Sequence, residues 1–102
     1  MTALEDKFHQ AMIGIYVAAA DECNYRAKAF LSMVVEMGGL AAAKQLLSTS
    51  EMQSGLLELF ECGRLDLTVE TLVLNDEYRE LFTRGELAEA ERRLSLLKSS
   101  DR

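Results

Sequence analysis

The sequence contains no proline, no tryptophan and only six glycines among its 102 residues. Proline and glycine are the residues least compatible with a helix interior, whereas alanine, leucine and glutamate, which are abundant here, are strong helix formers. Valine and isoleucine are sparse and never alternate with polar residues over a long run, as they would in a half-buried strand. The composition therefore predicts an all-α fold, a compact bundle of about five to six short helices, and argues against a sheet.

Residues that carry chemistry are equally scarce. The one histidine, His9, falls on the polar side of the first predicted helix, and we interpret it as a solvated surface residue. Neither His-x-x-x-His nor Cys-x-x-Cys occurs, so no metal-ligand spacing is present. Gly38-Gly39 lacks the Lys-Ser/Thr and the preceding strand of a phosphate-binding loop, and is more typical of a helix stop. We therefore expect no enzyme active site, no cofactor and no bound metal.

Long apolar runs are missing as well. The apolar run from Met12 to Ala20 is about half as long as a membrane-spanning helix requires, and the N-terminus lacks the basic start of a signal peptide. These features predict a soluble, cytoplasmic protein that does not enter a membrane. Cys23 and Cys62 lie far apart in the sequence, and we interpret them as two reduced, partly buried thiols in preference to a disulfide.

Apolar residues at intervals of three and four predict a first helix from Thr2 to about Cys23. Its expected buried stripe consists of Leu4, Phe8, Met12, Ile15 and Ala19. A second helix, with a buried stripe at Phe30, Met33, Val34 and Met37, ends at Gly38-Gly39. A third spans Leu40 to about Leu47. A fourth buries Met52, Leu56, Leu59 and Phe60 and ends at Gly63.

Residues that can cap helix N-termini mark the expected boundaries. They are Asn24 for the second helix, Ser50 with Gln53 for the fourth, Thr68 for the fifth, and Thr83 with Glu86 for the last. Asp76 to Phe82 is expected to form a short helical turn. The last helix carries its core face on Leu87, Ala90, Leu94 and Leu97. We predict one domain over residues 1–97 and a frayed tail over 98–102.

Several motifs occur in a characteristic order along the chain. They are Gly38-Gly39, Ser54-Gly55, the run Gly-Arg-Leu-Asp-Leu-Thr-Val-Glu over 63–70, Leu81-Phe82-Thr83, and Glu86-Leu87. In this order they resemble a family of small, uncharacterised bacterial helical proteins, and the resemblance covers roughly residues 8–97. It implies a bacterial or mobile-element origin and a helical fold. It brings no established activity and no catalytic residue.

The formal net charge of -6 is concentrated in one segment. Between residues 51 and 80 there are eight acidic residues and two arginines, Arg64 and Arg79, so the remaining residues sum to about zero. A concentrated negative surface can attract a basic protein partner, although a solvated face that maintains solubility has the same composition. The residues of this candidate face are Glu51, Glu58, Glu61, Asp66, Glu70, Asp76, Glu77 and Glu80.

A second candidate surface lies on the first helix, where Ile13 and Val17 fall beside the main apolar stripe. Gly14 and the nearby alanines would permit a close approach of another backbone. If other helices cover this side it belongs to the core, which we favour. If they do not, it is a homodimer seam or a docking site.

We therefore interpret the chain as a non-catalytic protein-interaction domain. A more specific hypothesis makes it an inhibitor of a bacterial defence complex, of anti-CRISPR or anti-restriction type. The alternative is a transcriptional regulator of helix-turn-helix type. We favour it less because Glu58, Glu61 and Glu70 would be repelled by DNA phosphates. Arg92 and Arg93, with neighbouring glutamates, are typical of surface ion pairs on the last helix.

Overall fold

The computed structural model describes residues 2–49 and 54–100, apart from the side chains of residues 54, 99 and 100. Within these ranges the chain forms six α-helices and two 3-10 turns, with no strand, which confirms the all-α prediction. The elements are α1 (Ala3–Glu22), α2 (Lys28–Met37), α3 (Gly39–Ser48), α4 (Ser54–Glu61), η1 (Leu65–Leu67), α5 (Val69–Val73), η2 (Arg79–Leu81) and α6 (Arg84–Ser100).

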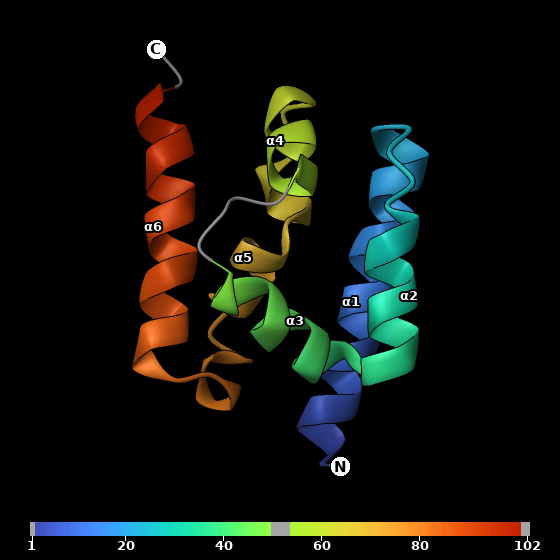
Figure 1. The fold of residues 1–102 in the computed structure, drawn as a ribbon, viewed down its shortest axis with the longest axis vertical. Helices are drawn as coiled ribbons and strands as arrows, with labels where there is room; N and C mark the ends of the chain where they lie inside the picture. Colours follow the sequence, from blue (N-terminus) through green and yellow to red (C-terminus); the bar gives the residue numbers. More distant parts are fainter. Residues whose placement is uncertain (1, 50–53, 101–102) are drawn as a thin grey trace.

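The helices are arranged as two outer layers joined by shorter elements (Figure 1). On one side α1 and α2 lie next to each other and run in opposite directions, while α6 forms the opposite side. α3 contacts α1, α2 and α6, so it connects the two outer layers. α5 packs on α6 and also reaches α1. The molecule measures 41 × 30 × 22 Å.

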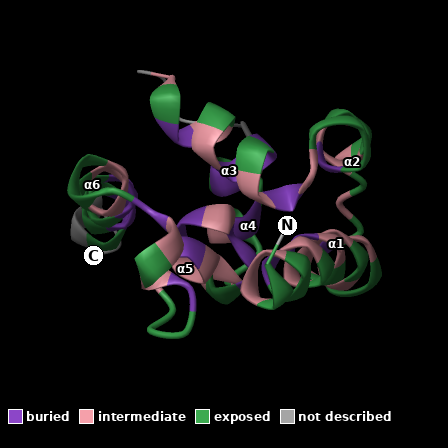
Figure 2. Cartoon of the chain, turned by 90° about the horizontal axis from the view of Figure 1, so that it is seen from below, coloured by how far each residue is buried: buried purple, intermediate pink, exposed green. Residues whose placement is uncertain are grey.

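The main core is formed by residues from both halves of the chain. Figure 2 marks buried positions on helices of both halves. Phe8 of α1 is completely buried and meets the rings of Tyr78 and Phe82 edge-on, with ring centroids 5.2 and 5.4 Å apart. Such edge-to-face pairs stabilise a core by about 0.5–1.5 kcal/mol beyond the area they bury. The other buried members are Met12, Val34, Ala42, Ala43, Leu47, Val73 and Ala90.

Two of the expected N-caps are present where the sequence places them. The Thr68 side chain accepts a hydrogen bond from the Thr71 backbone N–H at the start of α5. Thr83 and Glu86 form the expected capping box at the start of α6. Thr2 and Glu5 form a further capping box at the start of α1. The expected box of Ser50 and Gln53 lies outside the described residues.

The predicted start of the second helix at Asn24 is wrong. Asn24 adopts a left-handed backbone conformation, with φ at 53°, which asparagine tolerates better than most residues. Its side-chain oxygen accepts a hydrogen bond from Arg26 Nη1 at 3.0 Å. α2 begins four residues later, at Lys28, and its N-cap residue Ala27 supplies no side-chain cap.

Three further expectations need correction. Met37 is 46% exposed, although its spacing placed it on the buried stripe of the second helix. α6 continues to Ser100, three residues beyond the predicted end of the folded domain at residue 97. No atom lies within 4 Å of a Cβ built at Gly14, so Gly14 does not mark a close helix approach.

The close approach occurs instead at Gly39, against α1. The Gly39 backbone N–H donates to His9 Nδ1 at 2.8 Å, so the half-buried His9 caps the start of α3 and is not the solvated residue that we expected. A Cβ at Gly39 would lie 2.6 Å from the His9 Cα atom. Because that atom belongs to a helix backbone, it cannot move aside cheaply.

This contact predicts opposite effects of the same substitution at two glycines. Gly39→Ala should lower the free energy of unfolding by about 1–3 kcal/mol, because the added methyl overpacks the junction of α1 and α3. Gly14→Ala should raise it by about 0.5–1 kcal/mol, because alanine is the better helix former and space is available. Urea unfolding followed by circular dichroism measures both. Equal effects at the two positions would contradict the assigned contact.

Candidate functional site

Glu70 does not belong to the surface on which the sequence placed it. Thr68 caps α5 and so sets Glu70 in the first turn of that helix, where its side chain is 95% buried. There its Oε2 atom lies 3.1 Å from Nη1 of Arg93, which is itself completely buried. The expectation of a surface ion pair at Arg93 is therefore wrong as well.

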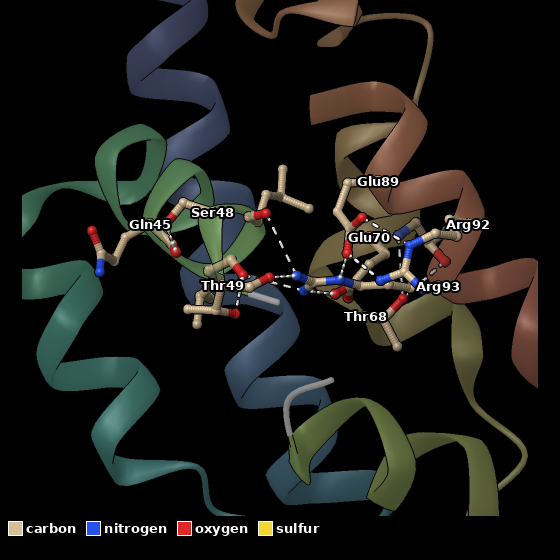
Figure 3. Close-up of polar contacts among 11 residues, drawn as sticks. Gln45, Ser48, Thr49, Thr68, Glu70, Glu89, Arg92 and Arg93 are labelled. Atoms are coloured by element: carbon tan, nitrogen blue, oxygen red, sulfur yellow. Dashed lines mark hydrogen bonds and ion pairs between the residues drawn. The ribbon is translucent and has the colours of Figure 1, made fainter. Parts of the chain in front are cut away.

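Arg93 extends from α6 to the C-terminal end of α3 (Figure 3). Its Nη1 atom donates to the carbonyl oxygen of Leu46 at 3.2 Å, and its Nη2 atom donates to those of Leu47 at 3.5 Å and Thr49 at 2.7 Å. The last carbonyls of a helix have no partner within the helix, and they carry the negative end of its dipole. One guanidinium therefore joins α6 to both α5 and α3.

A second carboxylate completes this network. Glu89, one turn before Arg93, accepts from Arg93 Nε at 2.6 Å and from the exposed Arg92 at 2.6 and 2.9 Å. The hydrogen bonds from Arg92 and then from Arg93 lower the pKa of Glu89 to about 2. A signal for this arrangement was present in the sequence, because Arg93 stands three residues after Ala90 and four before Leu97, on the core stripe of α6.

Replacing Arg93 should be far more damaging than replacing its neighbour. Arg93→Met leaves the Glu70 carboxylate buried without its partner and the end of α3 uncapped, which should lower the free energy of unfolding by about 3–5 kcal/mol. Arg92→Met removes an exposed ion pair and should have a much smaller effect. Chemical unfolding of the two variants provides the comparison, and losses of similar size would refute the buried network.

The lowered pKa of Glu89 also predicts a pH dependence of stability. Because the folded-state pKa of about 2 lies below the ordinary glutamate pKa of 4.5, the contribution of Glu89 to stability is complete above pH 4.5 and disappears as the pH falls towards 2. Unfolding free energies measured across this range should fall less steeply for Glu89→Gln than for the wild type. Two curves that run parallel through the whole range would show that Glu89 is not responsible.

The remaining acidic residues do not form the single face that the sequence predicted. Lys7, in the second turn of α1, forms an ion pair with Glu77, which places Asp76, Glu77 and Glu80 towards the start of that helix. Arg64 pairs with Glu22, in the last turn of α1. Lys7 and Glu22 are about 22 Å apart along the helix, at about 1.5 Å per residue. The expected face therefore consists of two separate groups of acidic residues, one near the start of α1 and one near its end. Glu51 lies outside the described residues.

A disulfide between Cys23 and Cys62 organises the group at the end of α1. The two Cα atoms are 6.0 Å apart, so the prediction of two reduced thiols is wrong. Cys23 directly follows α1 and Cys62 directly follows α4, and the bond closes a separation of 39 residues. In the loop-entropy picture, such a crosslink stabilises the folded chain by about 4 kcal/mol. The spacing of the two cysteines could not reveal this pairing.

We call the exposed carboxylates around this disulfide the acidic end. Asp21 and Glu22 precede Cys23, and Glu58 and Glu61 lie on the last turns of α4 before Cys62. Asp66 joins them because Arg64 Nε and Nη2 donate to its two carboxylate oxygens, each at 3.0 Å. Arg64 lowers the pKa of Asp66 through these hydrogen bonds. The five carboxylates of the acidic end thus outnumber the one guanidinium placed among them.

The two residues of the apolar surface expected on α1, Ile13 and Val17, also lie in different environments. Ile13 is half-buried and packs against the main core, as we favoured, whereas Val17 is 56% exposed. The two residues therefore do not form one apolar seam. Val17 alone provides a single exposed side chain, which is ordinary for a protein surface.

Sequence reasoning missed an apolar groove between α1, the start of α2 and the α4–α5 region. It encloses about 330 Å³ and is lined mainly by apolar side chains, among them Ile15, Phe30, Met33 and Leu59. Of the lining residues, Arg26, Lys28 and Ala29 are exposed, so they mark its mouth. Because five separate segments line the groove, including α3 through Leu46, no single pattern in the sequence indicates it.

Over the described ranges, no three histidine, cysteine, aspartate or glutamate side chains are grouped closely enough to hold a metal ion. No helix in the described part of the chain combines the length and the apolar character needed to cross a membrane. Searches against protein families, curated proteins and solved structures found no match. The family resemblance drawn from the motifs thus stays a prediction.

Proposed function

We propose that the chain is a non-catalytic protein-interaction domain that binds a basic protein through the acidic end. The observation that carries this proposal is the gathering of five exposed carboxylates from α1, α4 and η1 around one disulfide. Three separate segments contribute to the surface, so its charge is a property of the fold and not of one acidic run. A surface of this kind attracts a positively charged partner and orients it during encounter.

The local structure fixes the helix ends that carry these charges, and it holds the carboxylates of Glu22 and Asp66 in place. Cys23 and Cys62 join the ends of α1 and α4, and Ala19, Leu59 and Leu67 pack beneath them in a small buried cluster. Arg64 forms ion pairs with both Glu22 and Asp66. Carboxylates held in place lose less conformational freedom on binding than carboxylates on a mobile segment.

In a more specific form of the proposal, the partner is a bacterial defence complex of CRISPR or restriction type, and the domain inhibits it. The nucleic-acid channel of such a complex is basic, because it must neutralise phosphates. A small domain with a fixed negative surface can occupy such a channel in place of nucleic acid. The size and net charge of the chain support this role.

No observation favours the alternative of DNA binding. Lys44 on α3 is engaged by Glu86 at 2.7 Å, Arg92 is engaged by Glu89, and Arg93 is buried. α5 has five residues, fewer than two helical turns. We therefore do not propose the helix-turn-helix function further.

The proposal predicts that reversing charge at the acidic end abolishes partner capture, whereas reversing it elsewhere does not. The test variant is E58K/E61K, and the matched control is D76K/E80K, which reverses two exposed carboxylates near the start of α1. Each protein is immobilised and exposed to bacterial lysate at low and high salt, and captured proteins are identified by mass spectrometry. The affinity of the purified captured partner for each variant is then measured by biolayer interferometry.

The wild type and D76K/E80K should bind the same basic protein, and E58K/E61K should bind it at least about tenfold more weakly, with a strong dependence on salt. Equal losses for both variants would indicate a general effect of net charge. Unchanged binding by E58K/E61K would refute the acidic end as the binding surface. Thermal unfolding of all three proteins verifies that the variants are folded.

A further inference from the structure

We propose that the apolar groove binds a small amphiphile with an apolar chain and an anionic head group, of which a medium-chain acyl carboxylate is the type. This site is distinct from the acidic end and does not depend on the proposed protein partner. The proposal depends on three features of the groove: its apolar walls, the two cations at its mouth, and the uncapped start of α2 between them.

The walls of the groove suit an aliphatic chain. Ile15 and Ala19 come from α1, Phe30 and Met33 from α2, and Leu56 and Leu59 from α4. These side chains leave about 330 Å³ unfilled, which is near the lower limit of small-molecule sites, about 300–1,000 Å³. The groove therefore matches a short chain in both size and chemistry.

The mouth of the groove suits a negative charge. Arg26 and Lys28 line it and are exposed, and neither forms an ion pair among the residues that the structure describes. Arg26 uses Nη1 to donate to Asn24, which leaves the other donors of its guanidinium available. In a chain of net charge -6, two adjacent cations at the opening of an apolar groove select an anionic ligand.

The start of α2 adds to this positive field. Ala27 to Phe30 all line the groove, and no side chain caps the helix at Ala27. The first N–H groups of a helix lack partners within the helix and carry the positive end of its dipole. The Lys28 N–H already donates to the carbonyl oxygen of Arg26 at 2.9 Å, so a carboxylate near Arg26 and Lys28 can accept hydrogen bonds from the N–H groups of Ala29 and Phe30.

One acidic residue, Glu70, also lines the groove, but its charge does not repel an anionic ligand. Its carboxylate is buried and paired with Arg93 at 3.1 Å, so the charge is compensated within the protein. The exposed carboxylates of the acidic end are not among the lining residues. A small ligand accounts for the volume better than an amphipathic peptide helix, which needs anchor pockets spread over more than two turns.

Isothermal titration calorimetry with octanoate, decanoate and dodecanoate, each below its micellar concentration, tests the proposal. Affinity should rise about fourfold for each added CH₂ group until the groove is full. Decanoate should bind more tightly than decanol, and decyltrimethylammonium should bind most weakly. Backbone amide shifts in a parallel NMR titration should centre on residues 25–33 and on the facing sides of α1 and α4.

Two test variants separate the charge at the mouth from access to the apolar groove. R26E/K28E should remove the preference for decanoate over decanol, whereas K98E, which changes an exposed lysine of α6 outside the groove, should leave it intact. A29W places a bulky ring at the mouth and should weaken decanoate and decanol together. Circular dichroism verifies that each variant is folded.

Three results would overturn the proposal. The first is equal binding of decanoate and decyltrimethylammonium, which would indicate a general affinity for detergents. The second is a set of amide shifts that maps away from the groove. The third is the absence of acyl binding combined with binding of an acidic amphipathic peptide, which would make the groove a peptide-docking surface.

Discussion

The buried guanidinium of Arg93 is the interaction on which the arrangement of the helices depends. It lies where α3 ends, where α5 begins and where the middle of α6 passes, and it supplies donors to each. A buried cation of this kind is costly unless every donor has a partner, and here two carboxylates and three carbonyl oxygens meet that requirement. Burial of the charge therefore fixes three elements in one geometry.

α5, one of the helices that contact Arg93, depends on its tertiary contacts for its stability. A helix of five residues such as α5 is far too short to form independently in water. It is held by the Thr68 cap at one end, by Glu70 against Arg93, and by Val73 in the core. The turn after α5 then brings Tyr78 and Phe82 onto Phe8 of α1. The packing of α6 is thereby connected to α1, although few direct contacts join those two helices.

How far the sequence could predict this structure depends on how far apart the interacting residues lie. The capping box of Thr83 and Glu86 joins residues three apart, and the core stripes of α1 and α6 follow from helical spacing, so both were predictable. The contact of His9 with Gly39 spans 30 residues, that of Arg93 with Glu70 spans 23, and the disulfide spans 39. The position of Arg93 on the core stripe of α6 indicated that it is buried, but nothing in the sequence identified the residues with which Arg93, His9 or Cys23 pair.

The candidate sites were harder to predict than the fold for the same reason. The sequence located the acidic residues but not their grouping. The length of α1 separates Asp76, Glu77 and Glu80, near its start, from the acidic end, which is organised by the disulfide. The residues between α1 and α2 then connect the two candidate surfaces. Cys23 anchors the acidic end, and the left-handed turn at Asn24 delays α2 until Lys28. Had Asn24 capped the helix, Arg26 would lie in its first turn. Instead Arg26 precedes α2, Lys28 is its first residue, and both cations line the groove together with the uncapped helix start. Surfaces of opposite charge therefore lie only a few residues apart.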